Sequence, residues 1–318
     1  MRKKTFTTIA AAVTLVAGLA ACSSDDNDVD ISIPDDDVDC CSLEEEELTI
    51  RYLQDYEQIG SVGELQTDIY TIRLYSAGGK LTVGYNELLF TVIKTATGRH
   101  VKDVEFDSIA PLMTMRMDMG THVHSTPTGA ARRVASWIPV FRSHIAFLMP
   151  SNASAGNSWQ LAFDYRIRET SGRFESLPVE VAAAPEGSAW IRSFVWNEDT
   201  YYLTIAEPQK LVVGINEVRA VVSKKAAGQS ATEPYADAAE TFSIEVVPTM
   251  PDMGNHTSPG NEPLLFDSSA GFYKGRLNLT MTGRWDIHLV VRDAEGTAVA
   301  GDDTDGDGLS DIYWTIFI

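Results

Sequence analysis

Apolar and polar residues alternate along much of the chain after residue 47, for example in LTVGY (81–85), RLNLTM (276–281) and WDIHLVV (285–291). Gly, Pro, Asn and Asp lie between such segments. A period of two is typical of half-buried strands, and turn residues every 8 to 12 or so positions are typical of sandwiches. We find no convincing helical period after the first 21 residues. The pattern predicts an all-β chain of antiparallel, immunoglobulin-like β-sandwiches.

One unit of sequence occurs twice. KLTVGYNELLFTV (80–92) matches KLVVGINEVRAVV (210–222) without a gap, and Met-Gly-x-His elements and tryptophans Trp159 and Trp285 follow in both copies. A tandem duplication explains these matches. We predict a divergent first sandwich at 48–175 and a second at 185–318, with the two tryptophans anchoring the two cores.

The chain begins with basic residues 2–4 and an apolar run from Phe6 to Ala21, followed by Cys22. The run is too short for a membrane-spanning helix and indicates a secretory signal at 1–21. Its last residues, Leu-Ala-Ala-Cys, resemble the lipobox of bacterial lipoproteins. That resemblance implies a lipid on Cys22, which would anchor the protein to the outer membrane.

Residues 22–47 are predicted to form a disordered acidic tether, since positions 23–47 contain eight Asp and four Glu without Lys or Arg. The segment also resembles the acidic export signal of surface-exposed lipoproteins in one Gram-negative phylum, which implies exposure at the cell surface; a plain spacer is the alternative. With a net charge of -20, nucleic acid is excluded as a natural partner and cations are favoured. Adjacent Cys40 and Cys41 are expected to have no structural role, although a vicinal bridge, an intermolecular bridge and a thiolate metal site stay open.

Methionine and histidine cluster at 113–124 and again at 250–256. Thioethers suit Cu(I) and imidazoles suit Cu(II), so the mixed set predicts copper or a similar metal as cofactor. If LMTMRMDM (112–119) is extended, its four methionines share one face, and a turn at Gly120 brings the histidines back toward it. Pro251 favours a polyproline-like path that would align the second set. The predicted ligands are Met117, Met119, His122, His124, Met250, Met253 and His256.

Other methionines and histidines are expected to be structural. Met113, Met115, Met149 and Met281 are suited to filling gaps in the cores. His288 is predicted to lie at the surface, and His100 and His144 are assigned no function.

A separate acidic loop lies at 302–311, DDTDGDGLSD. Asp303, Asp305, Asp307 and Asp311 occupy positions 1, 3, 5 and 9 of a calcium-loop pattern, but Trp314 stands where a bidentate glutamate is expected. A calcium site and a simple polar hairpin loop are both consistent with this sequence.

The second unit resembles a known family through MPDMGNH (250–256), AGFYKG (270–275) and MTGRWDIHLVV (281–291). These elements look like the YtkA-like domain, which is related to the FixH family, over roughly residues 205–318. The resemblance implies a small extracytoplasmic β-sandwich, and FixH proteins are associated with assembly of copper-containing oxidases. The first unit departs from the pattern, since it lacks the proline between its methionines and has Ser143-His144 in place of Lys274-Gly275.

Common catalytic motifs are missing from the sequence. It contains no Gly-x-Ser-x-Gly, no phosphate-binding glycine loop, no His-Glu-x-x-His and no cysteine after Cys41. We therefore predict that the chain is not an enzyme but a cell-envelope lipoprotein that binds copper or a similar metal, for handling or delivery to an envelope protein partner. The alternative is a structural or adhesive surface protein whose Met-Gly-x-His segments are only turns.

Overall fold

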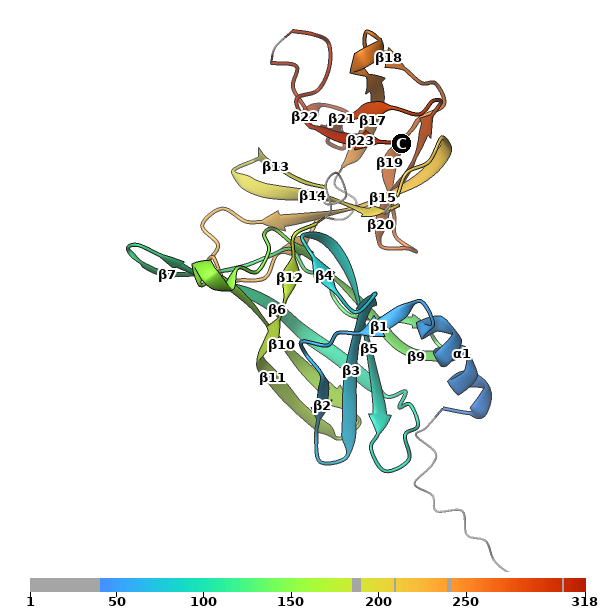
Figure 1. Cartoon of the computed structure of the whole chain (residues 1–318), viewed down its shortest axis with the longest axis vertical. Coiled ribbons are helices and arrows are strands. Elements are labelled where there is room, and N and C mark those ends of the chain that lie inside the picture. The colour runs from blue at the N-terminus through green and yellow to red at the C-terminus, as the bar shows by residue number, and fades with distance from the viewer. Residues whose placement is uncertain (1–40, 185–189, 209, 239–241, 305) are drawn as a thin grey trace, which may run out of the picture. The chain divides into compact units, whose positions relative to one another are not determined.

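The computed structural model describes residues 41–318 except 185–189, 209, 239–241 and 305 (Figure 1). Its regular structure is dominated by antiparallel strands, which confirms the all-β prediction. The predicted signal, Cys22, Cys40 and the tether as far as residue 40 lie outside the described residues. None of the described helices has the length and apolar character needed to cross a membrane.

Two antiparallel sheets and a short parallel pair enclose the first hydrophobic core. Within the described residues, one sheet has the order β1 (Tyr56–Gln58), β3 (Tyr70–Ala77), β5 (Gly84–Lys94), β9 (Ile138–Phe147) and β8 (Arg132–Ala135), with β2 (Glu64–Gln66) beside β3. The facing sheet has the order β11 (Thr170–Val179), β10 (Ser158–Ile167), β6 (Val104–Met117) and β7 (Gly120–Ser125). The parallel pair is β12 (Val181–Ala182) with β4 (Leu81–Thr82), and a 3-10 turn, η2 (Ala153–Ala155), precedes β10.

A second core forms inside one continuous, strongly bent path of strands. Among the described residues its order is β13 (Ile191–Trp196), β14 (Asp199–Glu207), β15 (Gly214–Lys225), β20 (Phe272–Leu279), β19 (Glu262–Asp267), β17 (Ser243–Met250), β21 (Arg284–Arg292) and β22 (Ala298–Ala300). Three short strands pair at its side: β16 (Ala236–Asp237) with β15, β18 (His256–Thr257) with β17, and β23 (Tyr313–Phe317) with β21. A 3-10 turn, η3 (Pro251–Met253), joins β17 to β18.

The matching sequence segments occupy matching strands. The order β3, β5, β9 around the first core corresponds to β14, β15, β20 around the second, and the pair β6 and β10 corresponds to β17 and β21. The sequence repeat is therefore also a repeat of strand pairing.

A buried asparagine makes the same hydrogen bonds in each copy. The Asn86 side chain accepts from the Thr82 amide (2.8 Å) and donates to the carbonyls of Thr82, Gly84 and Ile145 (2.7, 2.9 and 3.4 Å). Its counterpart Asn216 does the same with Val212, Gly214 and Leu277, at 3.0, 2.8, 3.0 and 3.4 Å. The Gly-x-Asn pattern thus fixes the entry into β5 and into β15.

The two predicted core tryptophans are also equivalent. Trp159 and Trp285 are both fully buried. The Trp159 indole N–H donates to the Met149 carbonyl and that of Trp285 to the Met281 carbonyl, each over 3.0 Å. Met149 and Met281 pack against the two cores, as expected.

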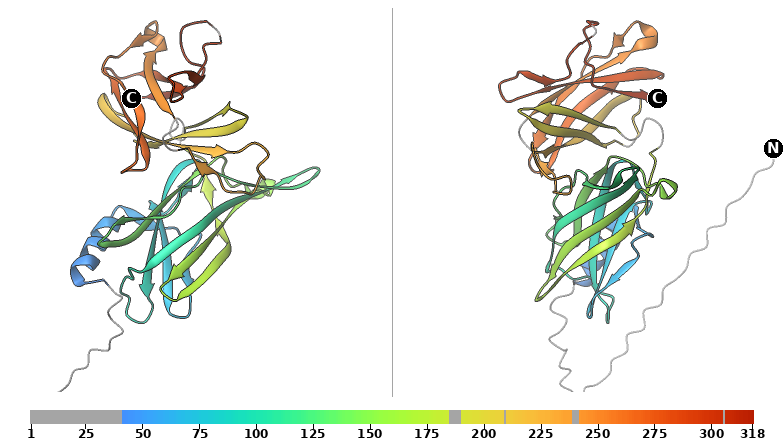
Figure 2. Two further views of the ribbon diagram at one scale, coloured as in Figure 1. Left: turned by 180° about the vertical axis from the view of Figure 1, so that it is seen from behind. Right: turned by 90° about the vertical axis from the view of Figure 1, so that its left-hand side faces the viewer.

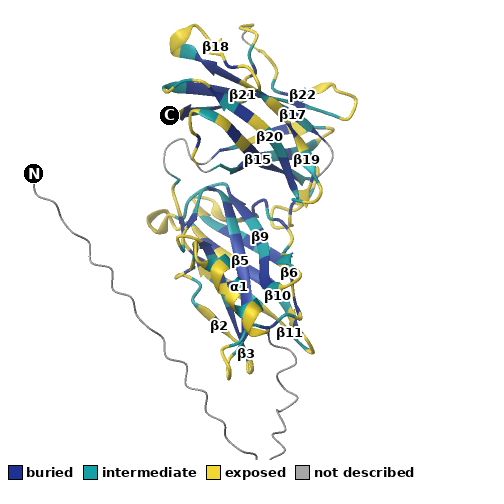
Figure 3. Cartoon of the chain, turned by 90° about the vertical axis from the view of Figure 1, so that its right-hand side faces the viewer, coloured by how far each residue is buried: buried dark blue, intermediate teal, exposed yellow. Residues whose placement is uncertain are grey.

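The prediction of a tether as far as residue 47 is wrong at its end, because α1 (Leu43–Leu53) begins inside it. The Ser42 hydroxyl accepts from the Glu45 amide while the Glu45 carboxylate accepts from the Ser42 amide, which is a capping box. The acidic residues of the first turn also interact favourably with the helix dipole. The helix packs against β9 and exposes its outer face (Figure 3).

The expectation that Cys41 has no structural role is also wrong. Cys41 is fully buried, and burial raises the pKa of its thiol to about 12, assisted by the negative charges of Glu46 and Glu45. The His100 amide and ring Nδ1 each lie 2.6 Å from a Glu46 carboxylate oxygen. These contacts hold the start of the helix on the sandwich.

His288 is buried, which corrects the surface prediction. It does lie on the opposite face of β21 from Trp285, but the segment around Ser310 covers that face: His288 Nδ1 is 2.7 Å from the Ser310 carbonyl oxygen. Alternation placed the residue on the correct face of the strand but could not reveal what covers it.

We predict that Asn86→Ala and Asn216→Ala each lower the free energy of unfolding by roughly 1 to 3 kcal/mol, because each leaves buried backbone groups without partners. Urea unfolding of the full chain would measure the loss. The control is Gln160→Ala, an exposed strand residue, for which we expect a change within about 0.5 kcal/mol. Asparagine variants as stable as this control would contradict the structural role of the repeated motif.

Candidate functional site

Strands β6 and β7 form a hairpin that extends beyond the rest of its sheet (Figures 1 and 2). Its turn consists of Asp118 and Met119, and Met117 pairs with Gly120, whose φ is 135°. The antiparallel register places Met115 opposite His122 and Met113 opposite His124. The sequence predicts histidines that fold back toward the methionine strand, and the register places them there.

Soft donors share one face of this hairpin. Alternate residues of a strand project to the same side, and residues directly opposite one another in a ladder do so as well. Exposure increases along this face: Met113 is fully buried, Met115 packs partly buried against the first core, and Met117 is 55% exposed. His122 is exposed beside Met115. The donors available to a ligand from solvent are therefore at the outer half of the hairpin.

The ring of His124 has a defined orientation. Its Nδ1 lies 2.9 Å from the Ser125 carbonyl oxygen, and its edge contacts the Trp159 ring at a centroid distance of 5.6 Å. A carbonyl oxygen can only accept, so Nδ1 carries the proton and the Nε2 lone pair is free of it. Metal-binding histidines are usually oriented in this way: the ring nitrogen that does not bind the metal donates its N–H to an acceptor in the protein.

Met119 does not belong to this face. We expected one extended segment through Met119, but β6 ends at Met117 because the two following residues form the turn. Met119 is 97% exposed at the tip.

The second Met/His segment is arranged differently from the prediction. Met250 ends β17 and is 4% exposed within the second core, so its thioether fills the core. Pro251 starts the 3-10 turn η3 instead of a polyproline-like path, and Gly254 and Asn255 follow with positive φ. Met253 is 54% exposed and His256 is exposed in β18. The three predicted ligands are therefore not presented together to solvent. Met250 is a core residue and not a candidate ligand.

The chemistry of the donors limits which metal ions could bind at the hairpin. In the part of the chain that the structure describes, no three His, Cys, Asp or Glu side chains gather into a metal site. A metal at the hairpin would consequently depend on thioether sulfur together with imidazole. Such a set suits a soft ion such as Cu(I) and is unsuited to calcium or magnesium, which prefer oxygen ligands.

Carboxylates of the acidic loop accept hydrogen bonds from the loop itself and so stabilise its turns. Asp303 accepts from the amides of Gly306 and Gly308 at 2.7 and 2.8 Å, and Asp307 accepts from that of Leu309 at 2.8 Å. Asp311 accepts from the Thr304 hydroxyl at 2.5 Å. These bonds are typical of a polar loop, while Asp305 lies outside the described residues.

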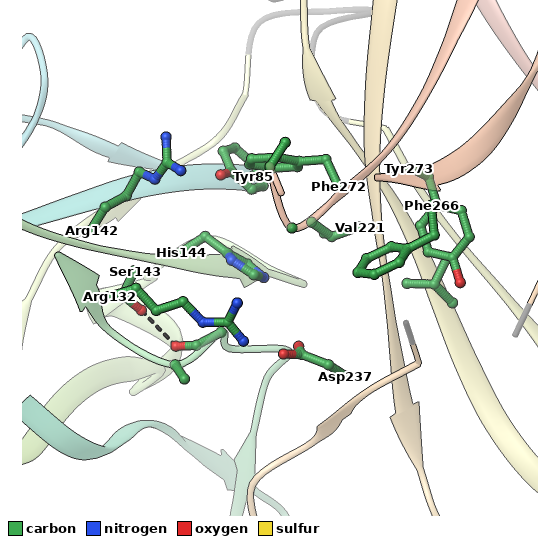
Figure 4. A pocket seen from close by; sticks show the side chains of 15 residues that line it. Tyr85, Arg132, Arg142, Ser143, His144, Val221, Asp237, Phe266, Phe272 and Tyr273 are labelled. Atoms are coloured by element: carbon green, nitrogen blue, oxygen red, sulfur yellow. Dashed lines mark hydrogen bonds between the residues drawn. The ribbon is translucent and has the colours of Figure 1, made fainter. Parts of the chain in front are cut away.

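Sequence reasoning missed His144. Its Nε2 is buried without a hydrogen-bond partner in the structure, and its ring stacks on Tyr85 at a centroid distance of 5.4 Å (Figure 4). Burial, assisted by the positive charge of Arg142, lowers the pKa of His144 to about 4. The available signal was its position in the repeat, because the second copy has Gly275 where the first has this bulkier, polar side chain.

We predict that His144 makes the protein less stable in acid. Since its pKa is lower in the folded protein than the ordinary value near 6.5, the unfolded chain binds the proton first. This contribution to stability is complete above about pH 6.5 and is lost as the pH falls toward about 4. Thermal unfolding of the full chain and of His144→Gln between these pH values would measure the difference. Parallel pH profiles would contradict a buried neutral imidazole.

Comparisons with known proteins identify no family. No protein-family model matches the chain, and no curated protein matches it. Among solved structures it is similar to a conserved domain protein from Bacillus anthracis, with 9% identity, coverage of 85% of this chain and 93% of that one, and a TM-score of 0.28.

Proposed function

We propose that this chain is a cell-envelope lipoprotein that binds Cu(I), or a metal of similar softness, at the outer half of the β6–β7 hairpin. The carrying observation is the register that sets Met115 opposite His122, with Met117 beyond them on the same face. His124 lies on this face too, with its Nε2 lone pair available. Handling or delivery of the metal to an envelope partner is the role that this exposed site supports.

The choice of donors supports a site that works outside the cytoplasm. Thioethers carry no proton, so they bind metal without competition from acid, and they do not form disulfides as thiols do in oxidising compartments. A mixed thioether and imidazole set can also accommodate both oxidation states of copper. The motif resemblance of residues 205–318 to YtkA-like domains favours an extracytoplasmic location, although it concerns the second copy and not the hairpin.

The proposed attachment rests on the N-terminal sequence. Leu-Ala-Ala-Cys at 19–22 favours a lipid on Cys22, and the acidic residues behind it favour display at the outer-membrane surface. The negative net charge of the chain would attract cations and repel anionic polymers.

We predict that the double variant Met117→Leu/His122→Asn binds Cu(I) at least about tenfold more weakly than the unaltered chain, since each lost donor removes one metal bond. The measurement is competition with a chromophoric Cu(I) chelator under reducing conditions. Leucine has nearly the volume of methionine, so the fold should be retained.

The matched control is Met281→Leu, a partly buried methionine that packs against the second core, for which we expect unchanged copper affinity. Comparing variants of one chain cancels any copper bound by its cysteines. The pair Met253→Leu/His256→Asn tests the second segment separately. Equal copper binding by all these proteins would refute the metal proposal and favour a structural or adhesive sandwich.

We further predict that Cys22→Ala leaves the precursor unprocessed or releases the protein from the membrane fraction, because the lipid acceptor is lost. Fractionation with detection of lipid attachment would measure this. The control Cys40→Ala should remain lipid-modified. A Cys22→Ala protein that still carries lipid would show that the anchor assignment is wrong.

A further inference from the structure

A cavity of about 110 Å³ lies where the first and second cores meet. Strands β5, β8 and β9 contribute one wall, and β15, β16, β19 and β20 contribute the other (Figure 4). For scale, an apolar cavity of about 150 Å³ can hold benzene. The cavity here is smaller but is not closed, so it can hold part of a small organic molecule while the remainder lies at its opening.

Part of the wall is apolar and aromatic. Tyr85 packs against the buried cluster of Ala206, Val221 and Phe272. The Tyr85 and Phe272 ring centroids are 6.2 Å apart, and Phe266 lines the same space. Such walls favour a ligand with an apolar body.

The imidazole ring of His144 occupies space that a side chain at position 129 would fill. A Cβ added at Gly129 would lie 2.3 Å from His144 Cε1, so only glycine leaves room for the ring in this position. The ring stacks on Tyr85, and Arg132 lines the same cavity (Figure 4). Its buried Nε2 has no partner in the protein, and a buried polar atom of this kind normally has one.

Positive charge at the cavity is not matched by ion pairs. In the described part of the chain, neither the Arg132 nor the Arg142 guanidinium forms an ion pair or a hydrogen bond; Arg142 rests over the Phe272 ring at 5.9 Å. The facing acid is Asp237, and Glu87 lies near Arg142. Burial raises the pKa of the Glu87 carboxyl, while the positive charge of Arg142 and the hydrogen bond that Glu87 accepts from Tyr56 act in the opposite direction.

We infer that this cavity binds a small organic carboxylate with an apolar body, its carboxylate held by Arg132 and by the Nε2–H of a neutral His144. Guanidinium binds carboxylates in its own plane through paired N–H groups. A neutral imidazole can carry its single proton on Nε2 and so donate to the same carboxylate. The aromatic walls then cover the remainder of the ligand.

The test is titration of the full chain with benzoate, observed by calorimetry and ligand NMR, against the neutral isostere benzamide and against inorganic phosphate. Benzoate should bind at least about tenfold more tightly than both, because benzamide lacks the charge and phosphate lacks the apolar body. Equal binding of benzoate and benzamide, or tighter binding of phosphate, would overturn the proposal.

Variants locate the site. Arg132→Gln should weaken benzoate by about tenfold, and Gly129→Ala should abolish binding by displacing His144, whereas Arg276→Gln, outside the cavity, should leave it unchanged. Asp237→Asn should tighten binding, since it removes a repelling charge. Weaker benzoate binding by Asp237→Asn would contradict a carboxylate held beside this acid, and undiminished binding by Arg132→Gln would refute the site even if Gly129→Ala does not fold.

Discussion

The fold depends on satisfying the backbone at the entry into the central strands β5 and β15. Each strand begins with a glycine of positive φ, Gly84 at 101° and Gly214 at 111°, and such a kink leaves peptide groups that cannot join a ladder. Asn86 and Asn216 bond these groups and also reach the next strand, through the carbonyls of Ile145 and Leu277. One side chain in each copy therefore fixes where the strand starts and which residues of it face the core.

Local periodicity and the repeat determined which features could be predicted from the sequence. Alternation located the strands, and the paired copies located the two core tryptophans. The helix α1 was missed because LEEEELTIRYL has the composition of a solvated segment, although Ser42 and Glu45 have the spacing of a capping box. Here a local capping signal and contacts with β9 outweighed composition.

Burial of individual polar or soft side chains could not be predicted in the same way. The sequence cannot tell whether the outer face of a strand is covered, and His288 was misplaced because a loop more than twenty residues later covers it. Met250 was misread for a related reason: Pro251 starts a 3-10 turn, so the methionine before it stays in the strand and points into the core. For the first copy, alternation was sufficient as far as Met117 and failed at Met119, where a two-residue turn ends the strand.

Comparison of the two copies shows how one framework can carry different chemistry. The asparagine bonds and the tryptophan anchors are the same in both, so the positions between them are free to differ. In the first copy the methionine strand continues past the core into an exposed hairpin, whereas in the second the strand ends at a buried methionine. Likewise β9 carries His144 where β20 carries Gly275, which lies so close to the carbonyls of Glu262 and Pro263 that no side chain would fit. In the second copy the adjacent strand occupies this space, whereas in the first the space is open to an imidazole and to the cavity beside it.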